Sequence, residues 1–186
     1  MHIILVSDRL TKTRSVTLTA RHLAGAAVAL SGLLQIVMGR LGLAGACVGM
    51  ARWALYKALD YVKVRKTFGR LIAEHQAVQI MLAECAMDIY AVKSMLRHCA
   101  WLIDEGRDAT KEVSMAKACA TEMVSRVVDK AIQVHGAIGL SNELRLEEAY
   151  RWARVLRIPD GTAEIQRRTI ARNLLKGHAS VRGHLG

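Results

Sequence analysis

Apolar residues recur at helical spacing through the middle of the chain. One stripe lies between His75 and Glu105, at alternating intervals of four and three residues: Val78, Leu82, Cys85, Ile89, Val92, Leu96, Cys99 and Ile103. A second stripe lies between Ala109 and His135: Val113, Ala116, Ala120, Val124, Val127, Ala131 and Val134. This spacing predicts two long amphipathic helices, each followed by a glycine that favours its end.

The connection between these two helices is short. Only residues 106–108 separate them, so the helices are expected to pack antiparallel. A third helix is predicted before them at about 43–63, and two shorter ones after them at 142–152 and 163–176. The fold class expected is therefore all-α, an up-and-down antiparallel helix bundle.

Composition and capping residues agree with an all-α fold. The 186 residues are 52% hydrophobic and include one proline and one phenylalanine, whereas all-β folds need frequent turn residues and aromatic strands. Ser141 and Thr162 stand where the two short helices need N-cap residues.

The cysteines and histidines indicate neither disulfides nor a metal site. The four cysteines show no CxxC pair and no disulfide-framework spacing, so they are expected to be core thiols in a reducing compartment, the cytoplasm or, in a eukaryote, the mitochondrial matrix. The seven histidines have no metal-ligand spacing.

The net charge is +11, from 27 basic and 16 acidic residues, and favours an anionic partner. The basic residues are spread from Arg9 to Arg182 without a block, which argues against a nucleic-acid-binding arm. They leave two interpretations open, a solvated basic surface or a phosphate site built from single arginines.

The uncharged stretch at 23–38 is the only candidate for a membrane segment. It is shorter than the roughly 20 apolar residues that a spanning helix needs, and Arg40 ends it. A packed helix rich in small residues is expected there rather than a membrane or export segment.

Three loop segments contain residues that could bind a ligand or act in catalysis, beyond what a helix bundle needs for folding. They are RKTFG at 65–69, QVHGAIG at 133–139 and RIPDGTAEIQ at 157–166. Glycines let a backbone approach a ligand, and a carboxylate before a helix N-terminus lies where anions are stabilised. Each segment also has a plain structural interpretation, as a helix–helix turn, a helix cap or a turn with an aspartate.

Together, in this order and at these distances, the three motifs resemble the C-terminal helical domain of the acyl-CoA dehydrogenase family, from about Val37 to Gly177. The resemblance divides the chain into an unassigned segment at 1–36, the bundle at 37–177 and a short tail at 178–186. It implies a homodimeric or homotetrameric FAD-dependent oxidoreductase of fatty acid metabolism that desaturates acyl-CoA thioesters. In that reaction a carboxylate takes the α-proton, the β-hydride passes to the flavin, and electrons leave through an electron-transfer flavoprotein.

The resemblance also implies roles for single residues. Asp160 stands at the catalytic-base position, where the family usually has Glu, and Arg40 and Gly161 stand at substrate-binding positions. In some branches the base lies on the first helix, at the position of Gly39 here, which cannot serve. The residues at FAD-binding positions are Arg65, Thr67, Phe68, Ile72, Gln76, Gln133, Gly136, Thr162 and Glu164. The first two motifs would contact the FAD of the neighbouring subunit, whereas the third would contact the FAD of its own subunit.

Three alternatives remain open. Aspartate at the base position also resembles nitroalkane oxidases, so a flavoenzyme of that kind is one alternative. The two domains that precede this one in the family, one helical and one β-sandwich-like, have no match in residues 1–36. A second alternative is therefore a non-catalytic helical assembly module, and a third is a basic nucleic-acid-binding helical protein.

Overall fold

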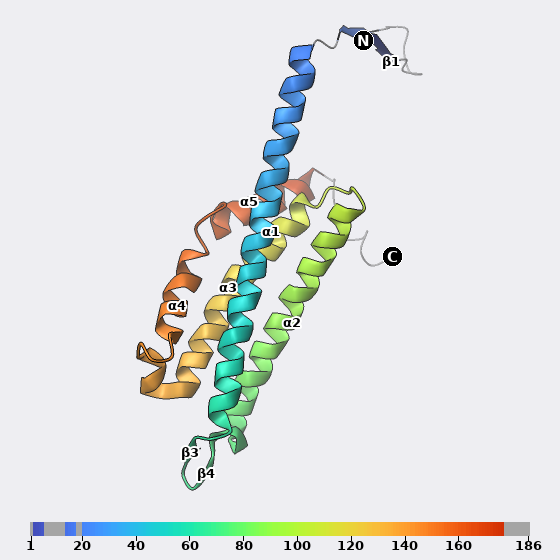
Figure 1. Ribbon diagram of the computed structural model, residues 1–186. Coiled ribbons are helices and arrows are strands. Elements are labelled where there is room, and N and C mark those ends of the chain that lie inside the picture. The colour runs from blue at the N-terminus through green and yellow to red at the C-terminus, as the bar shows by residue number, and fades with distance from the viewer. Residues whose placement is uncertain (1, 6–13, 18–19, 177–186) are drawn as a thin grey trace, which may run out of the picture. The chain divides into compact units, whose positions relative to one another are not determined.

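Five α-helices make up most of the computed structural model, which describes residues 2–5, 14–17 and 20–176 (Figure 1). They are α1 (Ala20–Val62), α2 (Gln76–Asp104), α3 (Thr110–His135), α4 (Leu146–Val155) and α5 (Ala163–Leu175). Short 3-10 helices precede α2 and follow α3: η1 (Ile72–Glu74) and η2 (Gly136–Leu140). The predicted all-α bundle is confirmed.

The chain divides into two units, Met1–Met38 and Gly39–Gly186. In the first unit, strands β1 (His2–Leu5) and β2 (Arg14–Thr17) pair antiparallel, with His2 opposite Thr17, and α1 begins at Ala20. The stretch at 23–38 is thus helical, as expected, but Ile36 and Met38 near its end are exposed rather than packed. Among the described residues, no helix combines the length and the apolar character that crossing a membrane requires. The tail predicted at 178–186 lies outside the described residues.

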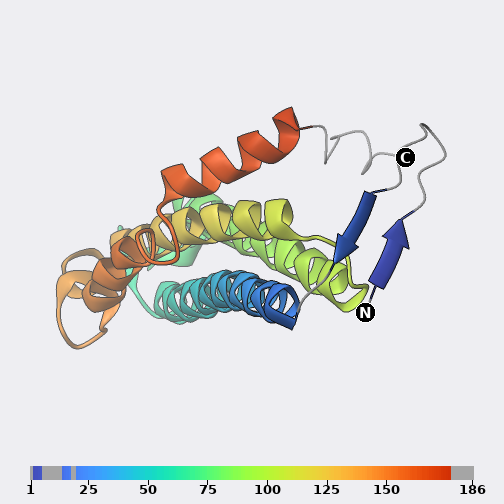
Figure 2. The same cartoon turned by 90° about the horizontal axis from the view of Figure 1, so that it is seen from above.

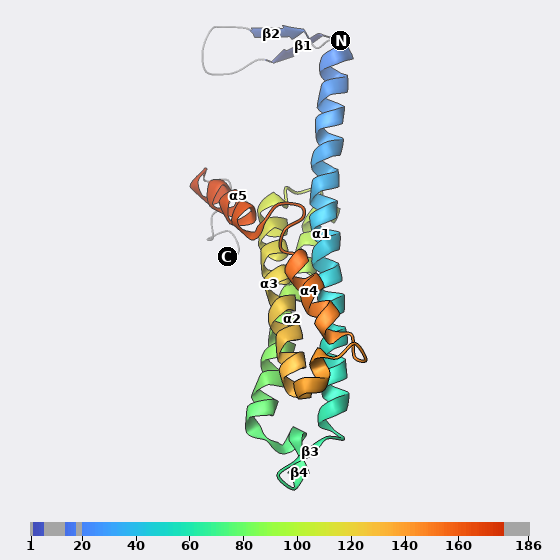
Figure 3. The same cartoon turned by 90° about the vertical axis from the view of Figure 1, so that its left-hand side faces the viewer.

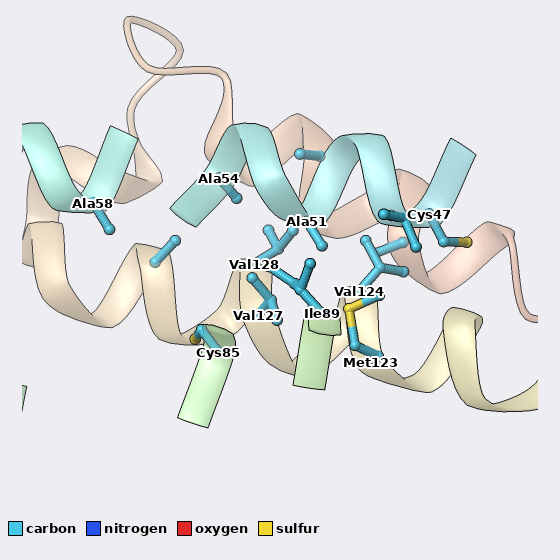
Figure 4. Packing of buried hydrophobic residues seen from close by; sticks show 14 of the residues in the cluster. Cys47, Ala51, Ala54, Ala58, Cys85, Ile89, Met123, Val124, Val127 and Val128 are labelled. Carbon is cyan, nitrogen blue, oxygen red and sulfur yellow. The ribbon is translucent and has the colours of Figure 1, made fainter. Parts of the chain in front are cut away.

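The core of the second unit is built where small residues of α1 meet branched residues of α3. Small buried residues follow one face of α1 at helical spacing: Ala44, Cys47, Ala51, Ala54 and Ala58. Their short side chains let α3 approach closely. Figure 4 shows the last four of these residues over Met123, Val124, Val127 and Val128 of α3, with Cys85 and Ile89 of α2 closing the cluster.

Helix α3 is the central element of this unit. Fifteen of its 26 residues are buried, whereas α2 buries five of 29. Helices α2, α4 and α5 all pack against α3 (Figures 2 and 3). The predicted stripe of α3 is buried throughout. In α2 the central stripe residues are buried, while Val78, Leu82, Leu96 and Ile103 are half-buried.

Three local predictions are wrong. Helix α1 runs without a break from Ala20 to Val62 instead of beginning at about residue 43. Helix α4 begins at Leu146 rather than at residue 142, because the Ser141 hydroxyl donates back to the Ile138 carbonyl (2.8 Å) and ends η2 instead of capping α4. The prediction of four core thiols fails at Cys119, which is exposed, while the other three cysteines are buried. Burial raises the pKa of Cys47 and of Cys99 to about 11.

Candidate functional site

The turn between α4 and α5 presents Asp160 in an unusual backbone conformation. Asp160 has φ of 56° and Gly161 has φ of 94°, so two consecutive residues lie in the left-handed region. Glycine adopts this region without steric cost, and aspartate is one of the few other residues that visit it. A side chain at Gly161 would also come within 2.9 Å of Gln166 Nε2. Asp160 itself is exposed.

Three side chains from three helices hold this turn by its carbonyl oxygens. Arg40 of α1 donates from Nε to the Asp160 carbonyl (3.1 Å), and Gln166 of α5 donates from Nε2 to the Asp160 and Gly161 carbonyls (2.9 and 3.1 Å). Lys117 of α3 donates from Nζ to the Gly161 carbonyl (2.7 Å) and, more weakly, to the Arg157 carbonyl (3.5 Å). The three residues predicted to meet substrate, Asp160, Arg40 and Gly161, are thereby brought together.

Gly39 lies against the Asp160 carboxylate. A Cβ atom placed on Gly39 would be 3.6 Å from Asp160 Oδ2. Gly39 and Asp160, the two positions that the resemblance implies for a base, are therefore neighbours in space. They are far apart in the sequence, since Arg40, which follows Gly39, is 120 residues from Asp160. The absence of a side chain at Gly39 leaves room beside this carboxylate.

Helix α5 begins directly after the turn, with Thr162 as its N-cap residue, as predicted. A hydrogen bond from the Glu164 backbone amide and another from the Thr162 hydroxyl lower the pKa of the exposed Glu164 carboxyl. Thr162 and Glu164 thus lie within a few residues of Asp160, at the same end of the bundle.

The RKTFG motif forms a tight hairpin rather than a plain helix–helix turn. Strands β3 (Lys66–Thr67) and β4 (Arg70–Leu71) pair antiparallel, with Lys66 opposite Leu71. Phe68 and Gly69 form the two-residue loop with φ of 51° and 80°, the pattern of a type I′ turn. Phe68 is 97% exposed. A strained backbone that presents an exposed aromatic side chain is typical of ligand-binding sites.

Polar side chains gather around this hairpin. The Nε2 atom of His75 lies 3.4 Å from Thr67 Oγ1, and its Nδ1 atom lies 3.1 Å from Arg70 Nη2. Gln76 is the exposed first residue of α2. Four exposed cations lie within eight residues of sequence: Lys63, Arg65, Lys66 and Arg70. Ile72, by contrast, is buried in the core cluster, so its part in cofactor binding stays a prediction.

The second motif, QVHGAIG at 133–139, lies at the same end of the bundle as the β3–β4 hairpin. The buried His135 stacks on Tyr61 near the end of α1, with ring centroids 4.4 Å apart, and its Nδ1 lies 2.7 Å from the Ala131 carbonyl oxygen. Gln133 and Gly136 next to it are exposed. Gly136 has φ of 65° and open space at its Cβ position.

The predicted residues therefore form two groups at opposite ends of α3 (Figures 1 and 3). Lys117, which holds the Asp160 turn, and His135, which adjoins Gly136, are separated by about 27 Å along α3 at a rise of ~1.5 Å per residue. Within the described part of the chain, no group of three or more possible metal ligands occurs.

Lys117 and Gln166 were not among the predicted residues. Both are fully buried, at 0% exposure. Lys117 stands at helical spacing from Val113, Ala120 and Val124. A lysine on the apolar face of a predicted helix is unusual, and this position in the sequence could have indicated that Lys117 is buried and paired.

Comparison with known proteins agrees with the family resemblance of the sequence. The family model described as "Acyl-CoA dehydrogenase, C-terminal domain" matches residues 23–175 and so begins upstream of Val37. The probable acyl-CoA dehydrogenase YngJ of Bacillus subtilis is 45% identical over 138 residues, which cover 74% of this chain and 36% of that protein. Subunit CarC of the caffeyl-CoA reductase-Etf complex of Acetobacterium woodii is 42% identical over 139 residues, covering 75% of this chain and 37% of that protein.

A solved structure shares the fold as well. The crystal structure of a probable acyl-CoA dehydrogenase from Mycobacterium abscessus matches with a TM-score of 0.75 and 34% identity, over 78% of this chain and 39% of that one. The chain thus spans well under half the length of the relatives it matches. With its sequence motifs, its helix bundle and these matches in agreement, the chain belongs to the acyl-CoA dehydrogenase family, and its bundle corresponds to the family's C-terminal domain.

Proposed function

We propose that the chain functions in the FAD-dependent α,β-desaturation of an acyl-CoA thioester, with Asp160 as the base that removes the α-proton. The observation that carries this proposal is the exposed Asp160 carboxylate on a left-handed turn that Arg40, Lys117 and Gln166 fix by its carbonyls. A base fixed in this way can be aligned with a bound substrate at little further entropic cost. FAD, when bound, accepts the hydride.

The hairpin end of the bundle fits a pyrophosphate. Arg65, Thr67 and Gln76 are exposed or half-buried donors, and the first turn of α2 contains no acidic residue. The positive end of the α2 dipole adds to their attraction for an anion. Gly136 leaves the backbone open to a close ligand. These features support FAD contacts from the first two motifs.

The separation of the two groups supports a flavin shared between subunits. The two groups of one chain lie about 27 Å apart along α3, a separation that favours contacts with two different flavins over contacts with a single one. In a homodimer or homotetramer, the hairpin end of one subunit would meet the Asp160 end of another. We propose this arrangement for the assembled protein.

The first test is retention of flavin. The purified chain is incubated with FAD and passed through a gel-filtration column, and its visible spectrum is recorded. Arg65→Ala is expected to weaken FAD binding much more than Arg107→Ala, the control, because Arg107 lies over the Trp101 ring in the turn after α2, at the other end of that helix. Equal losses in the two variants would contradict the role of Arg65.

The second test addresses the base. Asp160→Asn keeps the size of the side chain and removes its basicity, so exchange of the acyl-CoA α-proton with solvent deuterium should be lost while bound FAD is retained. Exchange that persists in Asp160→Asn would remove Asp160 as the base. Oxidation of a nitroalkane in place of an acyl-CoA would support the nitroalkane-oxidase alternative.

The identity of the electron acceptor can be proposed from a relative. The relative from Acetobacterium woodii is named as a subunit of a complex with Etf, and we propose an electron-transfer flavoprotein as the acceptor of this protein. Reduction of added electron-transfer flavoprotein in the presence of acyl-CoA would test it.

A helical assembly module is the second candidate function. Large apolar side chains are exposed along α2: Ile80, Met87, Tyr90 and Trp101. Exposed apolar surface of this kind favours self-association. A folded oligomer that remains colourless after incubation with FAD would support this candidate over the first.

A further inference from the structure

Lys117 is a fully buried lysine in the most buried helix of the bundle. Lysine is rarely buried unless its ammonium group has partners. Its neighbours on the same face of α3, Val113, Ala120 and Val124, are apolar, and an apolar side chain of similar length would fill the same space. The lysine therefore calls for an explanation beyond packing.

The ammonium group of Lys117 reaches away from its own helix. Its hydrogen bonds go to the carbonyls of Gly161 and Arg157, the two ends of the turn that contains Asp160. Burial lowers the pKa of Lys117, and the negative charge of Asp160 offsets part of this effect by favouring the charged form of the lysine. Lys117 thus acts on this turn through both a hydrogen bond and a charge.

The turn gains from such support because two consecutive residues lie in the left-handed region. Aspartate adopts this region more readily than most residues, but its conformation there still depends on its surroundings. Asp160 and Gly161 accept hydrogen bonds from Arg40, Gln166 and Lys117. Of these donors, Lys117 and Gln166 are fully buried, so their side chains join the turn to α3 and α5.

We propose that Lys117 is a positioning residue: from the core of the bundle it holds the Gly161 carbonyl and so fixes the direction in which the turn presents the Asp160 carboxylate. The consequence for catalysis rests on the proposed function of Asp160 as the base. The structural part of the proposal needs neither FAD nor substrate, so it can fail or succeed independently.

The test compares Lys117→Met with Lys111→Met. Lys111 is a matched control because it also lies in α3 and is also buried, but it pairs with Glu112 of its own helix (3.0 Å). In Lys117→Met, hydrogen exchange of the Ile158 amide, which donates to the Val155 carbonyl (2.9 Å) beside Arg157, should accelerate about tenfold or more, as expected for loss of a hydrogen bond from a charged donor. The strong NMR contact between the amide and α hydrogens of Asp160, which marks its positive φ, should weaken.

In Lys111→Met, both signals from the turn should stay as in the native chain. The proposal is overturned if Lys117→Met leaves the turn unchanged, or if exchange in the α2–α3 core rises as much as exchange in the turn, since Lys117 would then be a general structural residue. A third measurement needs no variant. In the isotope-labelled native chain, scalar coupling across the hydrogen bond between Lys117 Nζ and the Gly161 carbonyl carbon is expected, and its absence would also refute the contact.

Discussion

Gly139 is the position where the smallest possible change should have a large effect. It lies in η2, directly over the last turns of α3. A Cβ atom added there would meet the Ile132 carbonyl oxygen at 2.8 Å, the Ile132 Cα at 3.0 Å and the His135 Cβ at 3.1 Å. None of these atoms is the far end of a flexible side chain, so Gly139→Ala must displace η2 from α3.

This displacement of η2 lowers the stability of the fold. Adding a methyl group to a close-packed site typically costs about 1–3 kcal/mol, and the backbone contacts at Gly139 favour the middle of that range, about 2 kcal/mol. For a chain of this length, each kcal/mol lowers Tm by about 2–4 °C, so Gly139→Ala should melt about 4–8 °C below the native chain.

Thermal unfolding followed by circular dichroism measures this difference. Gly45→Ala is the matched control, because Gly45 lies within α1 and has nothing within 4 Å of its Cβ position. Alanine in a helix interior is favoured over glycine by about 0.5–1 kcal/mol, so the control should melt slightly above the native chain. A Gly139→Ala variant that melts at or above the native temperature would refute the packing argument.

Two further predictions concern the functional loops. Phe68→Asn should stabilise the chain by about 0.5–1 kcal/mol in urea unfolding, because asparagine before Gly69 suits a type I′ turn, and it should weaken FAD binding; destabilisation would contradict the turn assignment. Glu164→Gln should reduce the loss of stability on acidification. The lowered pKa of Glu164 stabilises the fold above the ordinary value of 4.5, and this contribution is lost as pH falls through the pKa in the folded chain. Urea midpoints at neutral and acidic pH would show the difference, and equal acid dependence in both chains would contradict it.

The helices were predictable because their apolar residues recur with the helical period. The apolar stripe of α3 is buried at every predicted position. Residues outside this stripe are buried as well. Lys117, Ser114 and Thr121 are also buried, since α4 and α5 cover further faces of the helix. Contacts with elements distant in sequence leave no periodic signal in a single helix.

The loops were predictable as motifs and not as conformations. Strands β3 and β4 have two residues each, too few for an alternating pattern. Phenylalanine is not a usual residue for a turn that requires positive φ. Ser141 was misassigned because a serine hydroxyl can end one helix as readily as begin another. Lys117 and Gln166 were missed as partners of the Asp160 turn because they lie on α3 and α5, and contacts between helices leave no periodic signal in the sequence of either one.

The placement of the two loop groups at opposite ends of α3 has a genetic consequence. If a flavin site takes its base from one subunit and its pyrophosphate contacts from another, then Arg65→Ala and Asp160→Asn damage different halves of each shared site. Unfolding and refolding the two defective chains together would then produce mixed dimers in which both lesions fall on one site and the other site is intact. Two inactive proteins would complement each other, whereas a site built within one chain could never be restored by mixing.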